Sequence, residues 1–266
     1  MTEASTHYGR RVLISGPPNS LKTTATMTWP PHRHHVSYPS EKGVDTLGKD
    51  NAEQTVWTWE YEDPAKVSPH ATVTAIETLT LEILAGKHGP CETFVGDGLH
   101  KLYGWYLARA WIDCGADADD LKGGMAYGRA HRDFQKYLDR LLQSPVPYVV
   151  CTIWEGRTKD DPADKSKNAQ THIFPDLPGE MAKRVVGEFS VVLYSEVSTP
   201  DPQGRIRGTW QIRPAGKVWG VGVKLPPSMA ATLPAKIEPD FRKLEPLLRP
   251  IGEVPPGPLS PLTTGG

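Results

Sequence analysis

A ten-residue segment near the N-terminus constrains the fold more than any other part of the chain. Residues 15–24 read Ser-Gly-Pro-Pro-Asn-Ser-Leu-Lys-Thr-Thr. The apolar run 11–14 before them predicts a short buried strand, and residues 25–27 after them can open a helix. A strand, a tight turn and a helix in this order are the context that a phosphate-binding loop requires.

The segment fits the pattern G-x-x-x-x-G-K-[ST] except at one position. Gly16 takes the first glycine, Lys22 the lysine and Thr23 the hydroxyl. Leu21 stands at the second glycine, where a side chain restricts backbone angles that glycine adopts freely. It either weakens nucleotide binding or is tolerated because it points away. An ordinary strand-to-helix turn with a stray lysine is the alternative interpretation.

The chemistry of such a loop suits ATP with Mg²⁺. Backbone N–H groups and the positive end of the following helix cradle phosphates. Lys22 adds a mobile charge for the β- and γ-phosphates, and Thr23 offers a hard oxygen to Mg²⁺. The candidate nucleotide-binding residues are Gly16, Pro17, Pro18, Asn19, Ser20, Leu21, Lys22, Thr23 and Thr24.

Composition limits the class of protein. The 266 residues, 38% hydrophobic and 23% charged, can form one large domain or a domain with an appendage. The net charge of −1 means that nucleic-acid binding requires a local basic patch. Three cysteines without metal-type spacing favour a reducing compartment. Because no apolar run has signal or membrane-spanning character, we expect a soluble cytoplasmic protein without a membrane partner.

Two acidic residues follow predicted strands. Residues 36–38 predict a strand, and Glu41 follows at its carboxyl end, where open α/β sheets bind ligands. Glu41 is therefore a candidate catalytic base for water, with a solvated loop glutamate as the alternative. The apolar run 92–97 ends at Asp97, a candidate Mg²⁺ ligand. The histidines of segment 32–35 lack well-spaced partner ligands, which favours a solvated loop over a metal site.

The remaining periodicities predict an α/β fold. Helices are expected at 71–84, 99–111, 127–142 and 177–189, and strands at 55–59, 147–153, 191–194, 209–213 and 218–221. The last strands are expected to add antiparallel to a mainly parallel sheet. The strand 147–153 ends at Trp154 and Glu155, and Glu155 is a candidate γ-phosphate sensor. The predicted parts are a flexible N-terminus (1–9), a core (10–225) and a proline-rich tail (226–266) in which 241–248 form a docking turn.

The polar segment 156–175 has no periodicity and is expected to be a long loop. Its basic side chains could bind single-stranded DNA as a mobile arm, although three aspartates in the same segment argue against this. The candidate DNA-binding residues are Arg157, Lys159, Lys165 and Lys167.

Together these motifs resemble the phage nucleotide-binding proteins of the RecA-like P-loop class, which includes phage RecA-type single-strand annealing ATPases. The resemblance covers roughly residues 10–245. It is carried by segments in a characteristic order, namely 16–23, 40–43, 93–99, 127–128, 149–155, 177–179 and 218–220.

The resemblance implies a three-layer RecA-like core and a role for each candidate residue. Lys22 and Thr23 would bind phosphate and Mg²⁺, Asp97 would be the second metal-side carboxylate, and Glu41 would activate water. Such proteins assemble head to tail, so a homo-oligomeric ring or filament is expected. A basic residue of one subunit would complete its neighbour's site, the candidates being Arg213, Lys217 and Lys224. Leu21 and Trp154 depart from the family pattern.

The function implied is that of an ATP-hydrolysing phage DNA-recombination protein in the host-cell cytoplasm. It would bind single-stranded DNA, promote annealing or strand pairing, and work with phage or host replication and recombination proteins. One alternative is a nucleotide-regulated binding module with little or no hydrolysis. Another is an ATPase that serves phage replication or packaging.

Overall fold

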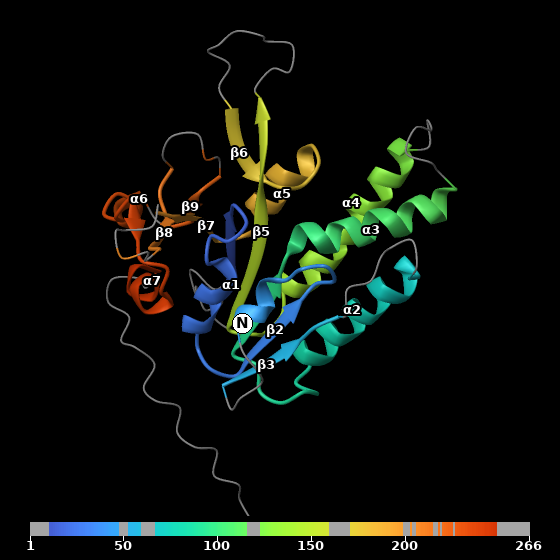
Figure 1. The fold of residues 1–266 in the computed structure, drawn as a ribbon, viewed down its shortest axis with the longest axis horizontal. Coiled ribbons are helices and arrows are strands. Elements are labelled where there is room, and N and C mark those ends of the chain that lie inside the picture. The colour runs from blue at the N-terminus through green and yellow to red at the C-terminus, as the bar shows by residue number, and fades with distance from the viewer. Residues whose placement is uncertain are drawn as a thin grey trace, which may run out of the picture.

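A single ten-stranded sheet forms the centre of the computed structural model, which describes residues 11–47, 53–59, 67–115, 123–159, 171–198, 203, 206–214, 218, 220–225 and 227–248 (Figure 1). Its strands are β1 (Arg11–Gly16), β2 (Arg33–Ser37), β3 (Gln54–Trp57), β4 (Thr93–Asp97), β5 (Tyr148–Lys159), β6 (Thr171–Pro175), β7 (Val191–Val197), β8 (Gly208–Gln211), β9 (Gly222–Val223) and β10 (Lys236–Ile237).

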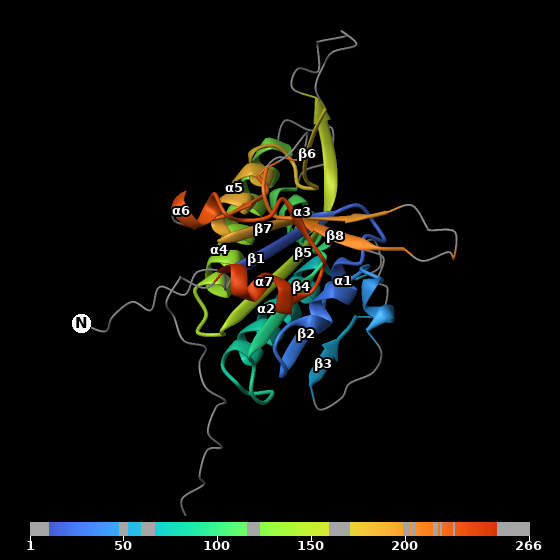
Figure 2. The same ribbon diagram turned by 90° about the vertical axis from the view of Figure 1, so that its left-hand side faces the viewer.

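The strand order is β10-β8-β7-β1-β5-β4-β2-β3, and in Figure 2 the parallel strands follow one another downward from β7, near the middle, to β3. From β3 to β7 all neighbouring strands are parallel. Antiparallel pairs join β8 and β9 to β7, β10 to β8, and β6 to β5. The expected mainly parallel α/β sheet with late antiparallel strands is confirmed.

Helices cover both faces of the sheet because its central strands are apolar on both sides. Val12, Leu13 and Ile14 of β1 are all 0% exposed. Leu13 packs into the cluster under the long helices, whereas Val12 and Ile14 face the opposite cluster. In Figure 1, α2, α3 and α4 lie to the right of β5 and α1 and α7 to its left.

The helices are α1 (Lys22–Ala25), α2 (Pro69–Leu84), α3 (Leu99–Cys114), α4 (Gly123–Leu142), α5 (Glu180–Glu188), α6 (Pro227–Ala230) and α7 (Phe241–Leu248), with 3₁₀ turns η1 (Thr26–Thr28) and η2 (Gly43–Thr46). The four helices expected from apolar periodicity are present as α2, α3, α4 and the shorter α5. None of the described helices combines the length and hydrophobicity that crossing a lipid bilayer requires.

Residues beyond 225 contribute to the packed structure. Strand β10 pairs with β8, and Phe241, Leu244 and Leu248 of α7 are buried in the second core cluster. The Phe241 ring lies 4.3 Å from the Trp29 ring, measured between centroids. The packed chain therefore continues into the segment expected to be a tail, at least as far as residue 248.

Three local predictions were wrong in whole or in part. The strand expected at 218–221 is replaced by the two-residue strand β9 at Gly222–Val223. Segment 156–175 is not one long loop, because β5 continues to Lys159 and pairs antiparallel with β6. The backbones of Arg157 and Lys159 lie in β5, and Lys165 and Lys167 lie outside the described residues. In the histidine-rich segment, His32 is exposed outside any strand, as expected for a solvated loop, but the residues after it are not. Strand β2 begins at Arg33 and pairs with β3 and β4 on its two sides, which buries His34 and His35.

Candidate nucleotide-binding site

The loop after β1 is braced by β7. Gly16 has φ +153°, and a Cβ there would lie 2.4 Å from the carbonyl oxygen of Ser195, so a larger residue would collide with the β7 backbone. The Ser195 hydroxyl donates a hydrogen bond of 2.5 Å to the Ser20 carbonyl, and Ser15 donates to Leu193 O at 3.2 Å. The neighbouring strand thus fixes the curvature of the loop from both ends.

Leu21 adopts the backbone conformation that glycine would adopt freely. Its φ of 62° and ψ of 18° are left-handed, which costs a residue with a side chain about 1–2 kcal/mol. The side chain leans toward β8, since its Cδ1 would lie 3.1 Å from a Cβ placed on Gly208. The loop therefore keeps a glycine-like path despite the leucine.

Lys22 lies folded into its own loop. Its Nζ donates hydrogen bonds to Gly16 O at 3.0 Å, Pro17 O at 2.6 Å and Ser20 Oγ at 3.2 Å. The residue is only 6% exposed. Burial lowers the pKa of Lys22 to about 8, although the nearby carboxylates of Asp97, Glu41 and Glu155 oppose the shift. The Lys22 ammonium is thus held where phosphate oxygens could replace the loop carbonyl oxygens as its hydrogen-bond acceptors.

Asp97, at the end of β4, is the centre of a buried hydrogen-bonded group. Thr23 Oγ1 donates to its two oxygens at 3.2 and 2.9 Å, the Thr152 hydroxyl donates to Oδ1, and His35 Nε2 lies 3.3 Å from Oδ2. Burial alone would raise the pKa of Asp97, but the interactions with His35, Thr152 and Thr23 outweigh it and lower that pKa. A carboxylate beside a threonine hydroxyl is a donor set that suits Mg²⁺.

Glu41 follows β2 and reaches the same region. Its Oε1 accepts hydrogen bonds from the backbone N–H groups of Lys42 at 3.1 Å and Gly43 at 3.3 Å. Its Oε2 is buried and has no hydrogen-bond partner among the described residues. Burial, reinforced by the charge of Asp97, raises the pKa of Glu41. A proton acceptor with raised affinity therefore lies beside the Asp97 group.

These residues surround a cavity of about 450 Å³, a volume typical of small-molecule sites. It lies where β1, β2 and β4 end, beside the middle of β5. Its lining residues are Pro18, Asn19, Ser20, Leu21, Lys22, Thr23, Thr24, Ser40, Glu41, Lys42, Gly43, Thr46, Asp97, Thr152 and Trp154. The candidate residues from three separate segments thus converge on one cavity, which fits a nucleotide with Mg²⁺ on Thr23 and Asp97.

In a comparison with known protein families, the family described as AAA domain matches residues 8–223 of this chain. The chain belongs to the AAA domain family. Among solved structures, the flagellar accessory protein FlaH from Methanocaldococcus jannaschii is similar at 10% identity and a TM-score of 0.37, over 82% of this chain and 83% of that chain. No curated protein matches the sequence.

The AAA domain contains site residues that the sequence did not indicate. Thr152 and His35 both contact Asp97, yet they belong to strands other than β4. The one available signal for Thr152 was a hydroxyl within the apolar run 149–153. Glu155, the candidate sensor, accepts a hydrogen bond from the Tyr194 hydroxyl, whereas Thr152 and Trp154 line the cavity.

Of the three basic residues expected to complete the site of a neighbouring subunit, two lie among the described residues. Arg213 Nη1 donates to Leu233 O at 3.1 Å, and the Lys224 ammonium donates to Gly187 O. Lys217 lies outside the described residues. Their action between subunits stays a prediction.

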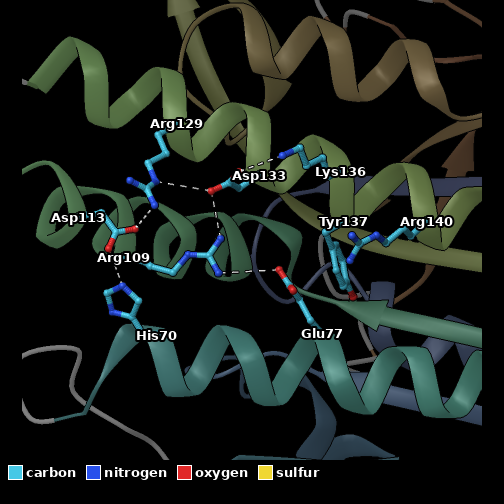
Figure 3. Close-up of a pocket in the computed structure, with 9 residues that line it drawn as sticks. All are labelled: His70, Glu77, Arg109, Asp113, Arg129, Asp133, Lys136, Tyr137 and Arg140. Carbon is cyan, nitrogen blue, oxygen red and sulfur yellow. Dashed lines mark hydrogen bonds and ion pairs between the residues drawn. The ribbon is translucent and has the colours of Figure 1, made fainter.

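A second cavity, of about 370 Å³, lies among α2, α3 and α4 (Figure 3). Its charged side chains pair with one another. Asp113 lies 2.7 Å from His70 Nε2 and 2.8 Å from Arg129 Nη2, and Asp133 lies 3.3 Å from Arg109 Nη2. These contacts link the three helices.

Proposed function

We propose that this AAA domain binds ATP with Mg²⁺ and hydrolyses it. The observation that carries the proposal is the convergence of Lys22, the Thr23–Asp97 pair and the unpartnered carboxylate oxygen of Glu41 at one cavity. Lys22 would exchange its loop carbonyls for phosphate oxygens, and Thr23 and Asp97 would hold the metal ion. Mg²⁺, when bound, neutralises charge that develops on the phosphates.

Glu41 is the proposed general base. In the reaction the oxygen of a water molecule forms a bond to the γ-phosphorus while the bond from that phosphorus to the β–γ bridging oxygen breaks. The electron pair of the broken bond leaves with ADP, and the Glu41 carboxylate accepts the proton of the water. The raised pKa of Glu41 favours this transfer near neutral pH.

ATP turnover by the purified full chain tests the proposal. We expect Lys22→Ala to abolish turnover, and Glu41→Gln to lower kcat by about 10²–10⁴-fold while ATP still raises the melting temperature. Lys87→Ala is a matched control, because Lys87 is exposed and its one side-chain ion pair among the described residues is with Glu82 at 3.4 Å. Turnover by Lys22→Ala at the wild-type rate would overturn the assignment.

The proposed biological role is phage DNA recombination through binding of single-stranded DNA and promotion of annealing, by a homo-oligomeric ring or filament. Support comes from the order of the sequence motifs and from the basic residues of segment 156–175. We expect single-stranded DNA to stimulate turnover, and binding to weaken steeply as salt rises. Replacing Lys165 and Lys167 with Ala should flatten that salt dependence. A salt-independent affinity would contradict contact with the DNA backbone.

A nucleotide-regulated module with little hydrolysis is the second candidate. The features that favour it are the leucine side chain at the position of the second loop glycine and the hydrogen bonds that hold Lys22 within its own loop. In that case ATP would stabilise the fold by mass action, by about 2.7 kcal/mol at a concentration 100 times the Kd, without turnover. Stabilisation by ATP together with absent hydrolysis, with or without DNA, would select this candidate.

A further inference from the structure

His100, in the first turn of α3, is a buried histidine whose polar atoms have no partner. Its side chain is 6% exposed, and neither ring nitrogen has a hydrogen-bond partner among the described residues. The ring stacks on Trp154, with 4.6 Å between ring centroids and 29° between planes. Because a buried polar group without a partner is destabilising, such an atom in a native structure calls for an explanation.

The nearest complementary atom is also unpartnered. Glu41 Oε2 lies 4.0 Å from His100 Nε2, and the Glu41 side chain is 9% exposed. This separation is too long for a hydrogen bond, but a closure of about 1 Å would form one. One small movement would therefore satisfy two buried polar atoms at once.

The surrounding structure restricts how that pair can move. A Cβ on Gly98, which has φ +90°, would lie 2.8 Å from Glu41 Oε2, so the carboxylate packs directly on this backbone. The Gly98 N–H donates to Thr152 Oγ1 at 3.0 Å, which ties the start of α3 to the Asp97 group. On the other side of the carboxylate, Oε1 remains with the N–H groups of Lys42 and Gly43.

The imidazole is neutral at physiological pH. Burial, with the neighbouring charges of Lys101 and Lys22, lowers the pKa of His100 to about 3, although Asp97 opposes the shift. A neutral ring carries one N–H, and that proton is needed on the nitrogen that faces a carboxylate. His100 thus supplies a hydrogen-bond donor without adding a positive charge that would compete with Lys22 for the phosphates.

We propose that His100 is a positioning residue for Glu41: its Nε2–H donates a hydrogen bond to one lone pair of Oε2. Together with the N–H groups on Oε1, this bond fixes the carboxylate so that the other lone pair of Oε2 faces the attacking water. The inference rests on the proposed role of Glu41 as base. Trp154 takes part by supporting the ring of His100, and Lys101 Nζ lies 4.6 Å from the Trp154 ring centroid. Trp154, within β5, therefore acts through packing.

Steady-state ATP hydrolysis by the full chain tests the inference with the pair His100→Gln and His100→Met. The two side chains have similar length, and only glutamine can donate a hydrogen bond. We expect His100→Met to lower kcat by about 10-fold or more, with KM and the ATP-dependent shift of melting temperature unchanged within about 2-fold. His100→Gln should recover at least about a third of the wild-type kcat.

His131→Phe is the control for the loss of a packed imidazole. His131 contacts the Tyr103 ring at 5.6 Å between centroids, and its Nε2 also has no partner among the described residues, but it lies on α4. We expect wild-type kcat for this variant. Equal kcat in His100→Met and His100→Gln, with Glu41→Gln inactive, would overturn the positioning role alone. Wild-type turnover by Glu41→Gln would instead overturn the proposed role of Glu41.

Discussion

Replacing Leu21 with glycine and with alanine distinguishes the contribution of the loop backbone from that of the leucine side chain. Leu21 occupies the glycine position of the phosphate-binding pattern with φ 62°. Leu21→Gly removes both the left-handed strain and the side chain, whereas Leu21→Ala removes most of the side chain and keeps the strain. The two variants together isolate the backbone contribution.

The expected magnitudes follow from the exposure and the backbone angles. Leu21 is 36% exposed, so removal of its buried portion loses about 1 kcal/mol of hydrophobic stabilisation. Relief of the left-handed conformation stabilises the fold by about 1–2 kcal/mol. The greater conformational freedom of glycine in the unfolded chain destabilises the fold by about 0.5–1 kcal/mol. We expect Leu21→Gly to be within about 0.5 kcal/mol of wild type and Leu21→Ala to be about 1 kcal/mol less stable.

Urea unfolding measures the change in stability of the two variants, and ATP turnover measures the change in kcat. A difference of 1 kcal/mol corresponds to about 2–4 °C in melting temperature for a domain of this size. Because the loop already follows a glycine-like path, we expect kcat of Leu21→Gly to change by less than about 3-fold, since 1.4 kcal/mol would be needed for 10-fold. Leu21→Ala more stable than Leu21→Gly would refute the left-handed conformation. A gain of 10-fold or more in turnover would refute tolerance of the leucine.

Three further predictions concern the site and the C-terminal segment. The lowered pKa of Lys22 means that the unfolded chain binds more protons between pH 8 and 10.5, so stability should rise with pH there, by on the order of 2–3 kcal/mol relative to Lys22→Met. Gly43→Ala places a Cβ 2.4 Å from the Thr23 hydroxyl and should lower kcat at least about 10-fold and raise the Mg²⁺ requirement. Phe241→Ala, at a site 4% exposed, should destabilise the fold by about 3–5 kcal/mol.

Each of these has a result that would contradict it. Parallel pH profiles of unfolding for wild type and Lys22→Met would show that Lys22 is not buried as a cation. Gly104→Ala is the control for Gly43→Ala, because a Cβ at Gly104 meets nothing within 4 Å, and equal kcat in both variants would exclude the clash. A melting temperature of Phe241→Ala close to wild type would mean that α7 does not contribute to the core.

The sequence by itself determined the local elements of the site. Gly16, Lys22 and Thr23 are contiguous with a strand and a helix, so their arrangement follows from a turn whose geometry is local. The runs ending near Glu41 and Asp97 were recognisable because apolar strands with polar ends have a short-range signal. The parallel α/β class followed from the alternation of such strands with helices.

Only the tertiary structure decided which strands are neighbours, and hence which side chains meet. Strand β5 pairs with β1 on one side and β4 on the other, which brings Thr152 to Asp97. His35 reaches the same carboxylate because β2 starts three residues earlier than its apolar run and pairs with β4. The partners of these buried polar side chains are distant in sequence, so no local sequence pattern predicts the contacts. The same reason placed His100 beside Glu41, a contact set by the packing of α3 and not by its periodicity.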